Sequence, residues 1–528
     1  MIALALFGCP APTEVPAPEV PAEIPELDPV GLARRMSLDL RGIPPTLDEY
    51  HQVRSDPSSL DALVDTWMAD PRFQQRLVEL YAEVYLTRTD AFPYTADDLH
   101  VPNDGTFAAS LGQEAPRIVA RIAADDLPYT ELVTGDWTMA DENLGAAFAL
   151  DRPDADGWQV SRYTDGRPAA GVLVTNAFAW RYTSTASNLN RKRANQVSRI
   201  LLCSDYLTKK IDFDRNVNLL DAGAVEDALT QNPACVSCHI TLDPIGSYFY
   251  GFWWFQEDSA IEASTYHPDR ENLWSTLSGV APGYHGEPGR SLADLGRQIA
   301  SDDRFVECGV QTAFELLNRR PAELSDFDAL TRHREAFLEG GLTLRPLLRS
   351  IVSDPAYRAD LTDIPGAQSR KLATPDLLAS SVEALTGYRW TYLNQDMLGS
   401  DVLGVRTLAG GADGTTVTRV SNLTNATAAL VQQRLAEGAV AHLFATDPGA
   451  LLGHLSFTET PDTDLATMQD QLVDLYLAVL GRPVAADGEE VAALLDLWRE
   501  LYAAEADPRA AWQGVVYAML RDPDFVLY

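Results

Sequence analysis

Hydrophobic residues recur at intervals of three or four along much of the chain, which is the spacing of an amphipathic helix. One such face consists of Leu60, Leu63, Val64, Trp67 and Met68. Another, near the C-terminal end, consists of Val491, Leu494, Leu495, Trp498, Leu501 and Tyr502. Large apolar side chains in this arrangement are typical of helices that pack into a core. The pattern therefore predicts a mainly α protein with few strands and no large sheet.

Three segments of the chain share one order of helix signals. Each begins with an apolar-periodic helix that ends near Gly or Arg and Pro, continues with a second helix, and closes on Asp-Pro-x-aromatic. The closing motifs are Asp70-Pro-Arg-Phe73, Asp354-Pro-Ala-Tyr357 and Asp522-Pro-Asp-Phe525. Proline ends a preceding helix, and Asp before Pro is a favourable start for the next one. The repeat predicts helical hairpin units around a central segment.

Each unit also has a polar residue three positions before an acidic one, which is the spacing of a capping box. The pairs are Thr46 with Glu49, Ser325 with Asp328, and Asp487 with Glu490. We expect the second helix of each unit to begin at these pairs.

A chain of 528 residues should contain about three or four domains, at about 100–200 residues each. Pattern and composition divide it into an apolar N-terminus (1–9), a Pro-rich tether (10–29), a helical domain (30–90), a mixed helix and loop region (91–170), a domain with a cysteine motif (171–290), a second helical domain (291–360), a mixed domain with a Gly-rich loop (371–460) and a C-terminal helical domain (465–528).

The charge balance is strongly acidic, with 76 Asp and Glu against 41 Lys and Arg, a net charge of −35. Such a surface repels nucleic acid and anionic lipid headgroups. We therefore expect no nucleic-acid partner, and either no specific partner or a cationic one.

The N-terminal residues Leu6-Phe7-Gly8-Cys9 resemble the end of a bacterial lipoprotein signal peptide, with Cys9 as the lipidated residue. The segment before them is short for a signal peptide and lacks a basic region, so an apolar N-terminus without this role is the alternative. Elsewhere no stretch approaches the ~20 apolar residues of a membrane span. The prediction is an exported periplasmic or outer-membrane lipoprotein that meets the membrane only through its lipid anchor.

Cys235-Val-Ser-Cys238-His239 is the attachment pattern of a c-type haem. Two thiols three positions apart lie on one face of a helix and can form thioethers with the two vinyl groups of one haem. The next residue then offers its imidazole to the iron. We expect one covalent haem c, with Cys235 and Cys238 as attachment sites and His239 as the proximal iron ligand. Its second ring nitrogen needs an acceptor, for which the carbonyl of Pro244 is a candidate, in a loop that the fixed φ of this proline would stiffen.

Three other interpretations of the cysteine pair remain open. One is a disulfide between Cys235 and Cys238. Another is thioredoxin-like redox chemistry, although no βαβ pattern surrounds the motif. The third is a structural zinc site, which export disfavours because thiols oxidise outside the cytoplasm. Its ligands would be Cys203, Cys235, Cys238 and Cys308, or His239 in place of one cysteine.

The densest aromatic stretch of the chain follows the motif and consists of Tyr248, Phe249, Tyr250, Phe252, Trp253, Trp254 and Phe255. These side chains could form the wall around a macrocycle, or they could form a core. Both interpretations stay open at this stage.

Cys203 and Cys308 remain after lipid and haem attachment. An exported protein seldom leaves two free thiols, so we predict a disulfide between them, with two buried thiols as the alternative. The bridge would close a loop of about a hundred residues.

The sixth iron ligand is the least determined part of the site. Met139 and Met397 both lie far from the motif in sequence, and a nearer candidate is His285, in a Gly- and Pro-rich loop. We favour His285 over His267, with an open or water-bound position and two exposed loop histidines as alternatives.

Several stretches together resemble the planctomycete-type cytochrome c proteins, which are built from several domains of unknown function. The stretches are Arg34-Arg-Met-Ser-Leu-Asp-Leu-Arg-Gly-Ile-Pro-Pro-Thr46, Arg193 to Cys203, Asn232-Pro-Ala-Cys-Val-Ser-Cys-His-Ile-Thr-Leu-Asp-Pro-Ile-Gly246, Phe305 to Cys308 with Leu317-Asn-Arg-Arg320, and Trp512 to Phe525. The usual Gly-Arg of the family reads Arg-Arg here. The resemblance implies an exported haem protein and no established reaction.

The sequence contains neither a Gly-x-Ser-x-Gly elbow nor a His-Glu-x-x-His motif. We therefore expect an electron carrier or redox partner in the cell envelope and not a catalyst. The alternatives are an envelope scaffold or binding lipoprotein whose cysteine motif is structural, and a haem peroxidase-like enzyme.

Overall fold

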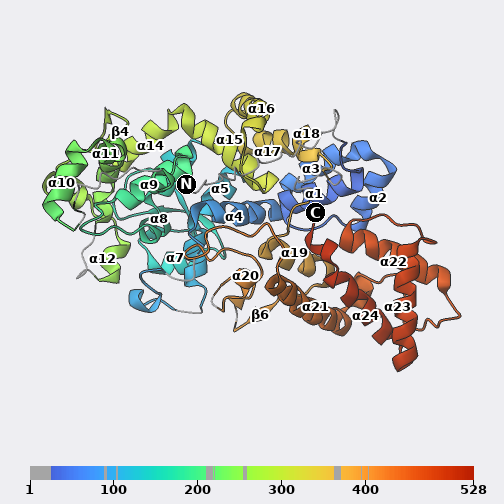
Figure 1. Ribbon diagram of the computed structural model, residues 1–528. Coiled ribbons are helices and arrows are strands. Elements are labelled where there is room, and N and C mark those ends of the chain that lie inside the picture. Colours follow the sequence, from blue (N-terminus) through green and yellow to red (C-terminus); the bar gives the residue numbers. More distant parts are fainter. Residues whose placement is uncertain are drawn as a thin grey trace, which may run out of the picture.

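The computed structural model describes residues 25–88, 92–102, 105–209, 218, 220–253, 259–361, 370–393, 395–401 and 403–528. In these ranges the chain forms 24 α-helices and seven short strands (Figure 1). The strands make one three-stranded sheet and two two-stranded hairpins. The prediction of a mainly α protein is confirmed for this part of the chain.

We call residues 25–361 the N-terminal body. Its helices are α1 (Pro29–Arg41), α2 (Leu47–Ser55), α3 (Leu60–Ala69), α4 (Pro71–Tyr85), α5 (Phe107–Ala124), α6 (Glu131–Thr134), α7 (Glu142–Ala147), α8 (Asn176–Arg181), α9 (Arg191–Leu202), α10 (Ala222–Gln231), α11 (Pro233–Gly246), α12 (Ala260–Ser264), α13 (Trp274–Leu277), α14 (Leu292–Ala300), α15 (Asp303–Asn318), α16 (Phe327–Glu339), α17 (Leu344–Val352) and α18 (Pro355–Arg358). Its strands are β1 (Thr138–Ala140), β2 (Leu150–Asp151), β3 (Gln159–Tyr163), β4 (Gly283–Tyr284) and β5 (Glu287–Pro288).

We call residues 370–528 the C-terminal body. Its helices are α19 (Pro375–Thr386), α20 (Val405–Leu408), α21 (Ala426–Thr446), α22 (Leu465–Leu480), α23 (Glu489–Glu505) and α24 (Pro508–Arg521). Its strands are β6 (Thr391–Tyr392) and β7 (Gln395–Asp396). All strand pairs in the two bodies are antiparallel, and β3 lies between β1 and β2.

Two separate hydrophobic cores underlie this division. One continuous core extends through the N-terminal body from Leu32 to Tyr357. A second core extends from Leu378 to Phe525 and joins α19 and α21 to α22–α24. Small apolar clusters link the two bodies, one of them formed by Val30, Tyr50 and Leu477.

The repeated sequence pattern corresponds to repeated local structure. The first helix of each unit ends on a left-handed residue, namely Gly42, Arg319 or Gly481, with φ of 77°, 56° and 62°. Asp70, Asp354 and Asp522 each cap a helical segment that begins with Pro. Each unit contains three helices before the Asp-Pro cap, one more than the hairpin that the sequence predicts: α1–α3, α15–α17 and α22–α24.

One of the three predicted capping boxes is present where expected. Thr46 and Glu49 cap each other reciprocally at the start of α2. The prediction for Ser325 and Asp328 is wrong, because Glu323 and Asp326 form the box two residues earlier. The prediction for Asp487 is also wrong: α23 starts after Gly488 without a side-chain cap.

Helix α1 buries polar side chains as well as apolar ones, and Asp39 is one of them. Its Oδ2 accepts hydrogen bonds from the Tyr357 hydroxyl at 2.7 Å and from Lys371 Nζ at 2.5 Å. Its Oδ1 accepts one from the Tyr528 hydroxyl at 2.9 Å. Asp39 as a whole is only 1% exposed to solvent. One buried charge thus joins α1 to three distant segments of the chain.

We expect Asp39→Ala to lower the free energy of unfolding by about 3–5 kcal/mol, because it leaves Lys371, Tyr357 and Tyr528 buried without their shared carboxylate partner. Urea denaturation followed by circular dichroism measures the change. Tyr528→Phe removes one neutral donor from the same carboxylate, and its expected cost is about 1 kcal/mol. Equal effects of the two substitutions would contradict this account.

Candidate functional site

The Cys-x-x-Cys-His motif lies in the first two turns of α11. Asn232 caps this helix by accepting a hydrogen bond from the Ala234 N–H at 3.0 Å, and Pro233 occupies the first helical position. The helix packs against α9, α10 and β4. It continues through Pro244, so the segment that we predicted as a stiffened loop is helical. In Figure 1, α11 lies at the end of the N-terminal body that is remote from α22–α24.

Cys235 and Cys238 are one helical turn apart, and both are free thiols. Cys235 is half-buried, whereas Cys238 is buried against the core. A disulfide between them is therefore absent from the structure. The four-cysteine zinc site is also incompatible with it, because Cys203 and Cys308 are bonded to each other.

The His239 imidazole is held by a carboxylate on its own helix. His239 Nδ1 lies 3.0 Å from Asp243 Oδ1, at the i,i+4 spacing. Arg191 of α9 in turn binds both oxygens of Asp243, at 2.6 Å from Nε to Oδ1 and 3.1 Å from Nη2 to Oδ2. A proton on Nδ1 leaves the lone pair of Nε2 available to a metal.

This carboxylate replaces the acceptor that the sequence suggested. The Pro244 carbonyl does not hold the ring, because Pro244 is part of the helix and Asp243 takes that place. Burial raises the pKa of Asp243, but the hydrogen bonds from His239 and Arg191 lower it by more, so that the pKa is lowered overall. The carboxylate is therefore ionised at neutral pH and able to orient the imidazole.

The described part of the aromatic run belongs to the core. Tyr248, Phe249, Tyr250, Phe252 and Trp253 are all buried. Phe249 stacks on Phe178 with ring centroids 6.0 Å apart, and Phe252 meets Tyr266 edge to face at 5.0 Å. Trp254 and Phe255 lie outside the described residues.

An open pocket of about 550 Å³ lies between α11 and the β4–β5 hairpin. Ile240, Thr241 and Pro244 line it from the helix, and His285 lines it from the hairpin turn. At 100° per residue, Pro244 lies about 140° around the helix from His239. The pocket therefore opens on the face of α11 away from the His239 ring, and a sixth-ligand role for His285 stays a prediction.

The other candidate ligands have separate surroundings. His267 Nε2 lies 2.9 Å from the backbone oxygen of Glu262, within the segment that follows α12. Met139 is buried in β1, opposite Val160. Met397 is buried in the C-terminal body.

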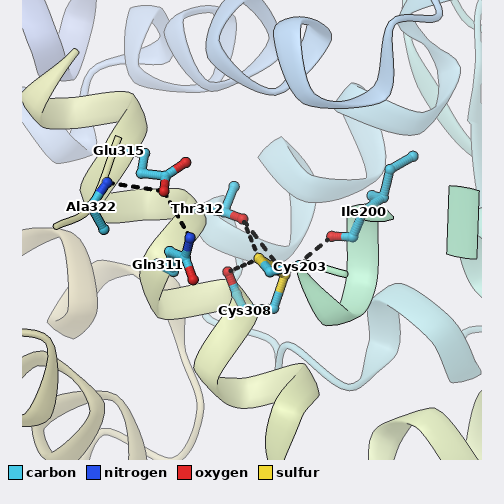
Figure 2. Close-up of a disulfide and its surroundings, with 7 residues drawn as sticks. All are labelled: Ile200, Cys203, Cys308, Gln311, Thr312, Glu315 and Ala322. Atoms are coloured by element: carbon cyan, nitrogen blue, oxygen red, sulfur yellow. Dashed lines mark hydrogen bonds between the residues drawn. A yellow bond between two sulfur atoms is a disulfide. The ribbon is translucent and has the colours of Figure 1, made fainter. Parts of the chain in front are cut away.

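Cys203 and Cys308 form a disulfide, with their Cα atoms 5.3 Å apart (Figure 2). Cys203 ends α9 in a left-handed conformation, and Cys308 lies within α15. The bond spans 105 residues of sequence and ties α9, which carries Arg191, to α15. It therefore supports the elements that position His239.

Within the described ranges, no helix is both long and apolar enough to cross a membrane. The same ranges contain no group of three or more His, Cys, Asp and Glu side chains arranged to hold a metal ion. Cys9 and the tether up to residue 24 lie outside the described residues.

Comparison with known proteins gives one partial match. Residues 21–143 match the family model described as "PSCyt2: Protein of unknown function (DUF1549)". The name is that of a planctomycete cytochrome-like domain. The match covers α1–α6 and β1 and ends before the motif on α11. No curated protein and no solved structure matches the chain.

Replacing both Cys203 and Cys308 by Ser should destabilise the N-terminal body by up to about 4–5 kcal/mol, the chain-entropy value for a loop of this length. Chemical denaturation of the double variant beside the oxidised parent measures the loss. The same experiment on the parent after reduction should give a similar value. No change in either sample would mean that the bond contributes nothing to stability.

Proposed function

We propose that this chain is an exported c-type haem protein that accepts or passes electrons in the cell envelope. The proposal depends most on one observation, the His239–Asp243–Arg191 chain of contacts. A histidine with Nδ1 fixed by a carboxylate is the usual arrangement of a metal-ligating imidazole. The partial match to a cytochrome-like family adds independent support.

The residues present on α11 fit the attachment of a haem. Cys235 and Cys238 provide two unpaired thiols at the spacing that the two vinyl groups require. His239 is the adjacent residue and directs Nε2 away from Asp243. Asp243, itself held by Arg191, binds Nδ1 and so fixes the orientation of the imidazole.

A bound haem supplies reversible one-electron transfer, with a potential set by its axial ligands and their hydrogen bonds. The chain contributes a surface that a redox partner can approach and a charge that attracts such a partner. The Ile240 side chain, next to His239 in sequence, is 69% exposed, so the outer surface of α11 is open to a partner. The net charge of −35 favours a redox partner with a basic docking surface.

Expression of the chain in a periplasm with c-type maturation machinery tests the attachment. We expect a pyridine haemochrome α-band that persists after denaturation, because thioethers survive unfolding. Cys235→Ala should shift the band, since one vinyl group is then left unsaturated, and Cys238→Ala should do the same. The Cys203→Ser/Cys308→Ser variant, which leaves the motif intact, should keep the band position of the parent, although its lower stability reduces the yield. A parent protein without covalent haem would refute the proposal and favour an envelope scaffold.

A second test concerns the contact that orients His239. We expect Asp243→Asn to raise the midpoint potential. A less basic imidazole and the loss of a negative charge both favour the reduced iron over the oxidised iron. Asp227→Asn removes the same charge from the exposed surface of the neighbouring helix α10 and should change the potential less. Redox titration of the three proteins measures the difference. Equal shifts in the two variants would show that Asp243 acts only through its charge.

A further inference from the structure

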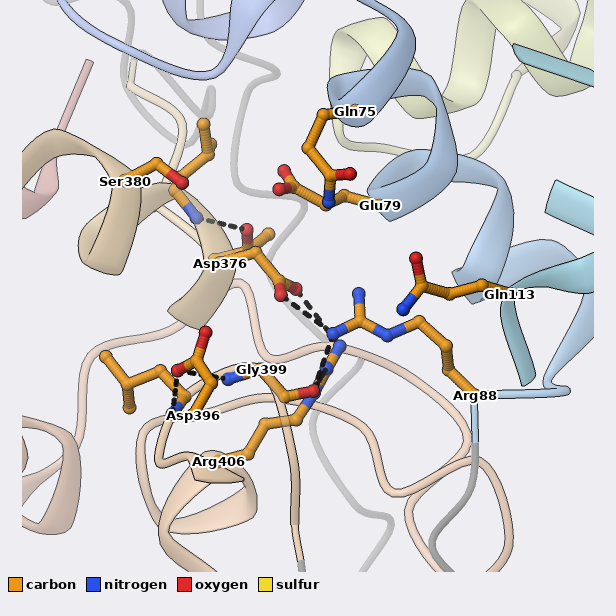
Figure 3. A network of polar contacts seen from close by, with 12 residues as sticks. Gln75, Glu79, Arg88, Gln113, Asp376, Ser380, Asp396, Gly399 and Arg406 are labelled. Atoms are coloured by element: carbon orange, nitrogen blue, oxygen red, sulfur yellow. Dashed lines mark hydrogen bonds and ion pairs between the residues drawn. The ribbon is translucent and has the colours of Figure 1, made fainter. Parts of the chain in front are cut away.

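A second pocket, of about 610 Å³, lies between α4 of the N-terminal body and α19 of the C-terminal body. Four arginines line it: Arg41, Arg72, Arg76 and Arg389. Figure 3 shows the two walls, with Gln75 and Glu79 of α4 pointing toward Asp376 and Ser380 of α19. A concentration of arginines is unexpected in a chain of net charge −35.

Arg76 is the most unusual of these residues, because it is charged, 1% exposed and incompletely paired. Its Nη1 donates to Glu79 Oε2 at 3.1 Å. Its Nε and Nη2 have no hydrogen-bond partner among the described residues. Buried donors without acceptors are destabilising. An acceptor brought by a ligand would relieve this deficit.

Hydrogen bonds and ion pairs to other protein groups hold Arg41 and Arg389 in place. Arg41 Nε donates to Ser37 Oγ at 2.9 Å, and its Nη2 is paired with Glu49. Arg389 is paired with Asp396 and lies 3.1 Å from Glu383. The Arg72 side chain is 58% exposed and only distantly paired, at 3.7 Å from Asp70. The pocket thus has a buried guanidinium at its base and a more accessible one at its rim.

Two acidic residues also line the pocket, namely Glu383, which is paired with Arg389, and Glu79. Glu79 is buried beside Arg76, and its pKa is raised, first by burial and then by the nearby charge of Asp376. A raised pKa increases the neutral fraction of this carboxyl group, which weakens its repulsion of an incoming anion. Asp376 itself is ion-paired, because a guanidinium nitrogen of Arg88 and one of Arg406 each lie 3.1 Å from one of its carboxylate oxygens.

We propose that this pocket binds a small molecule bearing an oxyanion, a phosphate or a carboxylate, through Arg76 at the base and Arg72 and Arg389 nearer the surface. Guanidinium groups bind such anions with two parallel hydrogen bonds. The volume is that of an ordinary small-molecule site. Because Arg76 and Arg389 belong to different bodies, the bound anion links them.

Isothermal titration of the full chain with inorganic phosphate, and separately with citrate, tests the proposal at low chloride concentration. We expect saturable binding of at least one anion, and the anion that binds identifies the class of ligand. Arg76→Gln should weaken binding by about tenfold or more, and Arg72→Gln by a smaller factor. Arg499→Gln, an exposed arginine of α23, is the control and should change the affinity less than about twofold.

Absence of binding by both anions would overturn the proposal, and so would unchanged affinity in Arg76→Gln. If Arg76→Gln does not fold, crystals of the parent soaked in selenate replace it. An anomalous peak within hydrogen-bonding distance of Arg76 supports the site. Peaks only elsewhere, or no peak, reject it.

Discussion

The carboxylate of Asp39 lies where four segments of the chain meet, and the arrangement of the two bodies depends on it. Tyr357 reaches it from the end of the N-terminal body, and Lys371 and Tyr528 reach it from the C-terminal body. The backbones of Lys371 and Tyr528 also bond to each other, at 2.7 and 2.9 Å. The two hydrophobic cores are separate, so polar contacts of this kind carry much of the junction between them.

The burial of Asp39 explains why α1 departs from an ordinary amphipathic pattern. Arg34 donates to the Phe525 carbonyl at 3.4 Å, and Arg35 donates to the Tyr357 carbonyl at 2.7 Å. Burying polar groups of a helix costs free energy unless they are hydrogen-bonded. Several of the partners here come from the closing motifs of the second and third units, whereas Nε and Nη1 of Arg34 have no hydrogen-bond partner among the described residues. The repeated Asp-Pro-x-aromatic segments therefore serve as contacts for α1 as well as helix starts.

Sequence reasoning succeeded where the determinants are local. The three Asp-Pro caps and the Thr46 capping box follow from spacing within a few residues. The mainly helical class follows from the recurrence of apolar residues at intervals of three or four. The contact between His239 and Asp243 could have been predicted from the sequence, because the two residues are four positions apart on one helix. Pro244 instead suggested a loop at this point. The Arg76 pocket could not be predicted from the sequence, because its two walls are separated by about three hundred residues of sequence. Only the packing of α4 on α19 places these side chains together.

The positions of the four described cysteines determine the order in which this protein can mature. Cys235 and Cys238 are three residues apart inside the 105-residue loop that Cys203 and Cys308 close. Short loops close at a smaller entropic cost than long ones, so unguided oxidation joins the near pair first. The two remaining pairings of the four thiols would each cross-link α11 to both α9 and α15. A correct product therefore requires that the near thiols stay reduced, or are already consumed, while the distant pair is oxidised.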